Sequence, residues 1–353
     1  MMAQHKAALR CGLQGRAEEL EQPGYMVIDL ADDVRRDIVR LSSIARRYFD
    51  LPEPEQGANA LPFGCGHWTY GFEHSGIPDS PDRVSFFGAS IRTATLADRL
   101  PTPLARELHR RLLGVFSTFE VMAEDLMVGL ASRCGLADAA ALRGGLRRWS
   151  MIQISRTLPT PAGDPIYHEH EDGHLLSFAQ ANGLGLEIST AGAYRRAPYS
   201  PASILVMPGE LMRLLTGGRV APLYHRVRAV PRKRPRLALL FFADLDPDLC
   251  APWVDGLADK AGCAAHVLSN AARFGMPCFT QEDPDPGGDL SDQLPTGNPP
   301  GYDINGIRTD NSGLCAFLLR IEGRSSSRLR SLFAIVPIRP LRSWVRLPSR
   351  SYW

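Results

Sequence analysis

The sequence has few cysteines and no long apolar run. Its seven cysteines are scattered, odd in number and never spaced as C-x-x-C, which argues against a disulfide framework and against a zinc knuckle. No segment approaches the roughly 20 consecutive apolar residues that a membrane helix requires. Residues 1–24 mix charged with apolar side chains and contain no uninterrupted apolar core like that of a signal peptide. We therefore expect a cytoplasmic protein without a membrane partner.

The sequence also lacks an excess of charge of either sign. It has 40 basic and 38 acidic residues, a formal net charge of +2 at pH 7. Because no overall field steers the chain toward a polyanion, we expect a small-molecule partner and no nucleic acid. The Arg-rich stretch 320–353 is interpreted as an appendage or a solvated helix, with nucleic-acid binding as the less favoured alternative. The composition leaves the oligomeric state open.

Helical periodicity is confined to the first part of the chain. The run Tyr25–Leu30 predicts a strand, and Asp32 or Asp33 is expected to cap a helix that ends before Pro52. Residues 56–90, rich in glycine, proline and aromatics, predict loops and short strands. A second helix is expected from Thr102–Pro103 to about residue 130.

From residue 148 onward, short β-rich runs separated by glycine, proline and asparagine predict a sandwich or distorted barrel. The runs are WSMIQIS, HLLSFA, LGLEI, SILVMP, LYHRVRAV and RLALLFFADL. We predict three parts: an N-terminal helical and loop region over 1–147, a β-rich core with a following helix over 148–282, and a Pro/Gly-rich link with the Arg-rich tail over 283–353.

The densest group of chemically active residues is the segment 167–174, YHEHEDGH, with a further histidine at His225. On an extended chain residues i and i+2 point to the same side, so His170 and Asp172 can both reach one ion. One more imidazole from a neighbouring strand, His225, completes a set of two histidines and one carboxylate. Such a set leaves three coordination positions open, which is what an iron(II) oxygenase needs. An exposed polar loop is the plain alternative.

A zinc hydrolase is the main rival for the same residues. The order His168-x-His170-x-Asp172 begins like the H-x-H-x-D-H motif of metallo-β-lactamase-type hydrolases, but Gly173 intervenes before His174. The identity of the bound metal distinguishes the two.

Residues 150–245 resemble the isopenicillin N synthase-like branch of iron(II)/2-oxoglutarate oxygenases. The resemblance rests on the ordered series His-Glu-Asp at 170–172, then LLSF, LGLEI, SILVMPGELMRLLTGG, His225-Arg-Val and Arg236-Leu-Ala238. It implies a mainly β fold with flanking helices, a double-stranded β-helix (jelly-roll) core with N-terminal helices packed against it. It also implies Fe(II) held by His170, Asp172 and His225, with 2-oxoglutarate and O2 as co-substrates.

In that family an arginine near the end of the core binds the distal carboxylate of 2-oxoglutarate, and Arg236 matches its position. Its planar guanidinium suits a bidentate carboxylate contact. Arg156 matches a second arginine that some bacterial members carry near the co-substrate. The usual Arg-x-Ser is Arg-x-Ala here, because Ala238 replaces the serine.

The resemblance implies a 2-oxoglutarate-dependent dioxygenase that hydroxylates, desaturates or cyclises a small polar secondary metabolite of a bacterial antibiotic-type pathway. The alternatives are an isopenicillin N synthase-type oxidase that uses no 2-oxoglutarate, in which Arg236 binds a substrate carboxylate, and the zinc-dependent hydrolase. Candidate substrate contacts are His67, Tyr70, Glu73, His74, Tyr167 and His168.

Overall fold

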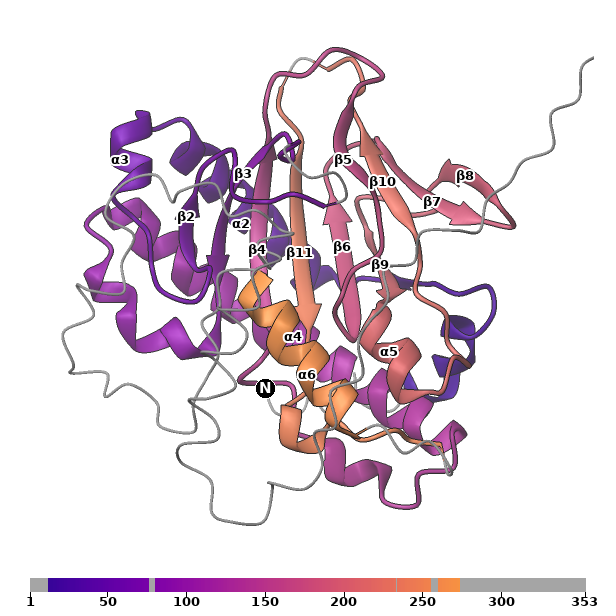
Figure 1. The fold of residues 1–353 in the computed structure, drawn as a ribbon. Coiled ribbons are helices and arrows are strands. Elements are labelled where there is room, and N and C mark those ends of the chain that lie inside the picture. Colours follow the sequence, from indigo (N-terminus) through magenta and orange to yellow (C-terminus); the bar gives the residue numbers. More distant parts are fainter. Residues whose placement is uncertain (1–11, 76–79, 233, 255–259, 274–353) are drawn as a thin grey trace, which may run out of the picture. The chain divides into compact units, whose positions relative to one another are not determined.

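The computed structural model describes residues 12–75, 80–232, 234–254 and 260–273 (Figure 1). The predicted link and Arg-rich tail at 283–353 lie outside the described residues. Within the described ranges the chain consists mainly of antiparallel strands with helices around them, which confirms the predicted mainly-β class. No helix in these ranges is long and apolar enough to cross a membrane.

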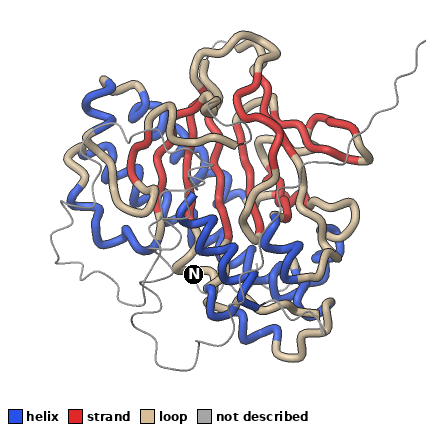
Figure 2. Tube along the Cα trace, in the orientation of Figure 1, coloured by secondary structure: helices blue, strands red, loops and turns tan. Residues whose placement is uncertain are grey.

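The larger of two sheets has seven antiparallel strands in the order β1-β9-β6-β11-β4-β3-β2, drawn in red in Figure 2. Their bounds are Met26–Asp29 (β1), Gly66–Trp68 (β2), Val84–Ala89 (β3), Met151–Thr157 (β4), Leu176–Ala181 (β6), Ser203–Pro208 (β9) and Leu237–Ala243 (β11). Three of the seven come from the region predicted over 1–147. That region therefore contributes strands to the sheet as well as helices around it.

The smaller sheet has four antiparallel strands in the order β5-β10-β7-β8. Their bounds are Pro165–His170 (β5), Leu186–Thr190 (β7), Ala193–Arg196 (β8) and His225–Arg228 (β10). β5 and β8 fall outside the apolar runs of the sequence because they carry polar side chains at partly or fully exposed positions. A cluster of buried side chains, including Ile166, Leu186 and Met207, joins this sheet to the larger one.

The other face of the larger sheet is covered by α2 (Asp32–Phe49) and α4 (Pro103–Arg133), as Figure 1 shows. Phe116 and Phe119 of α4 pack on Phe241 and Phe178 of the sheet, with ring centroids 5.2 and 5.9 Å apart. The remaining elements are α3 (Glu53–Gly57), α5 (Glu210–Leu215), α6 (Lys260–Arg273), η1 (Gln14–Leu20), η2 (Ile91–Arg99), η3 (Ala139–Leu142) and η4 (Pro247–Leu249).

The start of α2 differs from the prediction. Ala31 occupies the N-cap and no side chain caps the helix, so the predicted capping by Asp32 or Asp33 is wrong. Both acids instead lie in the first turn, where a negative charge interacts favourably with the unpaired backbone N–H groups. The Asp33 carboxylate accepts a hydrogen bond from the backbone N–H of Val34 at 2.9 Å.

Candidate metal centre and cavity

Two adjacent strands bring the predicted metal ligands together. His170 ends β5 and faces His225, the first residue of β10, in direct register. Asp172 follows two residues later, and its carboxylate oxygens lie 3.6 Å from His170 Nε2 and 3.9 Å from His225 Nε2. One ligand atom from each side chain lies within 4.8 Å of the other two. Among the described residues this is the one such group of three or more His, Cys, Asp and Glu.

Both imidazoles are held with Nε2 toward the carboxylate. His170 Nδ1 lies 2.7 Å from the carbonyl oxygen of His168, and His225 Nδ1 lies 3.1 Å from that of Leu223. A carbonyl oxygen only accepts, so in each ring Nδ1–H donates and the Nε2 lone pair is left for a metal. Backbone partners of this kind orient metal-binding histidines and fix their tautomer.

Burial by itself would raise the pKa of Asp172, but the neighbouring His225 and His170 outweigh it and the net shift is downward. The carboxylate therefore stays ionised, as a metal ligand requires. The backbone around it is closely packed, since a Cβ at Gly209 would lie 2.1 Å from the carbonyl oxygen of His174 and 2.5 Å from that of Asp172. Position 209 must consequently be glycine for this loop to keep its path.

The other two histidines of the 167–174 segment face elsewhere. His168 Nε2 lies 3.0 Å from Ser80 Oγ, and His174 Nδ1 lies 2.7 Å from the Asp244 carboxylate and stacks on Phe242. The His-x-His-x-Asp pattern of the zinc hydrolases is thus not assembled at one point.

Arg236 directly precedes β11 and faces a cavity beside the metal triad. The space in and in front of the cavity measures about 760 Å³, including the part open to solvent. Arg236 is 4% exposed, and its Nε has no hydrogen-bond partner among the described residues. An anionic ligand in the cavity would supply that partner.

Arg156 lies on the opposite face of the sheet, so its predicted place beside the co-substrate is wrong. On β4, Gln153 points into the cavity, and the alternation of a strand turns Arg156 toward the helices, together with Ile152 and Ile154. Its guanidinium donates a hydrogen bond to the carbonyl of Phe49 at the end of α2 and lies 5.4 Å from the centre of that ring.

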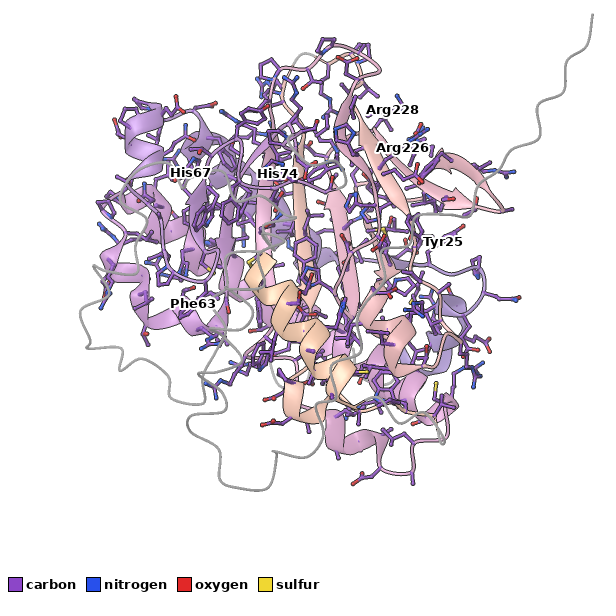
Figure 3. All side chains as sticks on the ribbon, in the orientation of Figure 1. Tyr25, Phe63, His67, His74, Arg226 and Arg228 are labelled. Atoms are coloured by element: carbon purple, nitrogen blue, oxygen red, sulfur yellow. The ribbon has the colours of Figure 1, made fainter. Side chains whose placement is uncertain are left out.

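Three of the six candidate substrate contacts line the cavity, namely Glu73, His74 and Tyr167. His67, Tyr70 and His168 do not belong to its lining. Figure 3 marks His67 on β2 and His74 on the loop that follows it. His67 is buried against the rings of Tyr48 and Phe49, on the side of the sheet that faces α2.

Comparison with known proteins agrees with this geometry. A family model described as the 2OG-Fe(II) oxygenase superfamily matches residues 149–244. Leucoanthocyanidin dioxygenase 1 of Oryza sativa subsp. indica is 36% identical over 96 residues, which are 26% of this chain and 25% of the rice protein. The 2-oxoglutarate-dependent dioxygenase ecdG of Aspergillus rugulosus is 24% identical over 288 residues, 72% of this chain and 85% of the fungal protein. Residues 149–244 are therefore similar to the 2OG-Fe(II) oxygenase superfamily.

Solved structures of such oxygenases share the fold. A full-length protein of Neurospora crassa, solved in complex with alpha-KG, superposes with a TM-score of 0.58 at 13% identity, covering 74% of this chain and 90% of the Neurospora chain. The rice dioxygenase for auxin oxidation superposes with a TM-score of 0.53 at 21% identity, covering 67% of this chain and 79% of the rice protein. These likenesses confirm the predicted double-stranded β-helix. The chain spans about a quarter of the length of the first rice relatives that it matches.

The residues of this site fit the metal and co-substrate that the name of the matching family implies. Two imidazole nitrogens and one carboxylate oxygen are the donor set typical of a mononuclear iron(II) site with open positions. The buried arginine in the adjoining cavity fits the distal carboxylate of 2-oxoglutarate.

Sequence reasoning missed Gln153 and Asp82, which also line the cavity. The sequence could have identified Gln153, because a polar residue between Ile152 and Ile154 marks the polar face of its strand. Asp82 precedes β3 in a loop and carries no comparable signal.

Proposed function

We propose that this chain is an Fe(II)/2-oxoglutarate-dependent dioxygenase acting on a small molecule. His170, Asp172 and His225 would hold the iron, and Arg236 would bind 2-oxoglutarate. The observation that carries the proposal is that a converging His-Asp-His group and a buried arginine with an unpaired Nε share one cavity. When bound, iron(II) with 2-oxoglutarate and O2 supplies the oxidising power to functionalise a C–H bond, with succinate and CO2 as co-products.

The chain's own residues would bind, orient and exclude water. The Nδ1 hydrogen bonds of His170 and His225 hold the rings in place, so little reorganisation is needed when a metal binds. Arg236 would fix one end of the co-substrate by charge-assisted hydrogen bonds. Apolar side chains from both sheets, among them Leu186 of β7 and Met207 of β9, keep the cavity wall dry beside the metal site.

The polar part of the cavity supports a polar substrate, since Glu73, Asp82 and Gln153 lie in its wall. Hydroxylation, desaturation and ring closure all use the same protein ligands, and the reaction outcome stays a prediction. A bacterial antibiotic-type pathway and a cytoplasmic location likewise stay predictions, and the relatives named above come from plants and a fungus.

The test is an anaerobic titration of the apo-protein with Fe(II) and then 2-oxoglutarate, monitored by the weak visible charge-transfer band of the chelate. We expect the band in the wild type and a roughly 10- to 100-fold weaker 2-oxoglutarate affinity in Arg236→Ala, because charge-assisted hydrogen bonds are lost. Arg156→Ala is the matched control and should titrate like the wild type.

Three outcomes would redirect the assignment. Iron binding without a band, and no succinate in air, would favour the oxidase that uses no 2-oxoglutarate. Binding of zinc alone would favour a hydrolase. Equal weakening in both arginine variants would remove Arg236 from its proposed role.

A further inference from the structure

The cavity contains more hydrogen-bond acceptors than the metal and the co-substrate use. With the triad assigned to iron and Arg236 to 2-oxoglutarate, the remaining polar lining includes Glu73, Asp82, Gln153 and Glu171. Arg236 is the only arginine or lysine among the described residues that line the cavity. The lining left for the primary substrate therefore carries the carboxyl groups of Glu73, Asp82 and Glu171 together with the imidazole of His74.

Two of these groups are side by side. Gln153 Nε2 donates a hydrogen bond to Glu73 Oε1 at 3.0 Å, and the Tyr167 hydroxyl donates to Glu73 Oε2 at 3.3 Å. Each carboxylate oxygen can accept a second hydrogen bond. Gln153 is 0% exposed, and its Oε1 accepts no hydrogen bond from the described residues. Because Nε2 is engaged by Glu73, the amide keeps Oε1 as a further acceptor.

Asp82 is less suited to bind a cation than Glu73. Burial raises the pKa of Asp82 to about 8, so at neutral pH its carboxyl is mostly protonated, and it already accepts a hydrogen bond from Ser75 Oγ at 2.7 Å. Burial also raises the pKa of Glu73, to about 7, but the hydrogen bonds from Gln153 and Tyr167 oppose the shift. A cation beside Glu73 would favour its ionised form further.

We propose that Glu73 and Gln153 form the recognition site for a protonated primary amine of the substrate, and so select amine-bearing small molecules. This inference rests on the proposed function and names its substrate class. A primary ammonium has three N–H donors and no acceptor, which matches the two Glu73 oxygens and Gln153 Oε1. Glu73 follows β2 and lies outside the part matched by the family model, so a residue outside that part would set the specificity.

The test uses matched pairs that differ only in the charged group: benzylamine with benzyl alcohol, and pentylamine with pentanol. Each is titrated calorimetrically at pH 8 into the anaerobic protein loaded with Fe(II) and 2-oxoglutarate. We expect each amine to bind at least tenfold more tightly than its alcohol in the wild type. Glu73→Gln should abolish the preference and leave the chelate band and the 2-oxoglutarate affinity unchanged within twofold.

Gln153→Met is the second variant, and it should reduce the preference while keeping Glu73. Glu187→Gln is the matched control, because Glu187 pairs with Arg226 of β10 at 2.7 Å and does not belong to the cavity lining. It should behave like the wild type.

Amines that bind no better than alcohols, or a preference that survives in Glu73→Gln, would overturn the amine site. A failure of every amine to bind would do the same. A wild type that prefers amines but shows no chelate band would remove the proposed function and leave the amine site standing, so the two failures are distinguishable.

Discussion

The two faces of the larger sheet have opposite chemistry although the same strands build both. On β11, Leu237, Leu239 and Phe241 face the helices and are at most 3% exposed. Arg236, Ala238, Leu240 and Phe242 alternate with them and line the cavity. β4 repeats the pattern, with Ile152 and Ile154 toward the helices and Gln153 toward the cavity.

Within a single strand, the helix-facing side chains therefore serve stability and the cavity-facing side chains serve ligand binding. The helix-facing side chains pack in a closed apolar layer, where each buried methylene contributes to the free energy of folding. The cavity face keeps buried polar groups such as Arg236 Nε and Gln153 Oε1 that have no hydrogen-bond partner in the described part of the chain. Such groups cost stability until a ligand satisfies them. Substitutions on the two faces should therefore change different measured quantities.

The largest contrast is expected between neighbouring leucines. Leu239→Ala should lower the free energy of unfolding by about 2–5 kcal/mol, because it leaves a cavity in the closed layer. Leu240→Ala should cost only about 1 kcal/mol, because its side chain is partly exposed to the cavity. Urea denaturation of both variants measures the difference. Equal costs would show that the cavity wall is packed as tightly as the helical layer.

The next contrast compares two buried histidines. His225→Ala should weaken Fe(II) binding at least roughly 100-fold if His225 binds iron as proposed. Removing a group that only orients a metal ligand weakens binding by up to about that factor, and this variant removes the proposed ligand itself. His109 is buried in α4, where its Nε2 lies 2.9 Å from Thr93 Oγ1 of η2, and His109→Ala should leave Fe(II) affinity unchanged. Competition with a chromogenic iron chelator provides the measurement. Comparable losses in both variants would point to a global effect of unfolding.

Acidification should change the stability contributions of a buried histidine in α4 and of a carboxyl in the cavity in opposite directions. Burial lowers the pKa of His109 to about 4, so its neutral form is favoured in the folded protein and stability is lost as the pH falls through 6.5, the value for the unfolded chain. Burial raises the pKa of Glu73 to about 7, so stability is gained as the pH falls from above 7 toward 4.5. Between pH 7 and pH 5, the titration of His109 and that of Glu73 each change the free energy of unfolding by about 2 kcal/mol.

Variants separate these two contributions. Compared with the wild-type apo-protein, His109→Gln should lose about 2 kcal/mol less on acidification from pH 7 to pH 5, and Glu73→Gln about 2 kcal/mol more. Denaturation curves at both pH values give the difference. The groups that act on Glu73 are Gln153, Tyr167, Asp172 and His174. If Glu73→Gln left the pH dependence unchanged, the Glu73 carboxyl would be solvated and the amine site weakened.

The sequence predicted the metal group and the strands because both follow from local spacing. His170 and Asp172 share a side of the chain two residues apart, and the apolar runs mark the strands with a closed face. Arg156 was misplaced by resemblance although strand alternation groups it with Ile152 and Ile154. Glu73 was one of six substrate candidates, and only the path of its loop between β2 and β3 brings it to Gln153.

The smallest effect expected concerns the position where this chain departs from the family. Ala238 is 1% exposed and lies on the cavity face two residues after Arg236, where the family usually has serine. Ala238→Ser would add a hydroxyl donor beside the arginine, worth about 1 kcal/mol, and should tighten 2-oxoglutarate binding roughly fivefold. Titration of the chelate band measures it, with the helix-facing Ala243→Ser as a control that leaves the affinity unchanged. An unchanged affinity in Ala238→Ser would mean that the carboxylate is already satisfied without a donor at position 238.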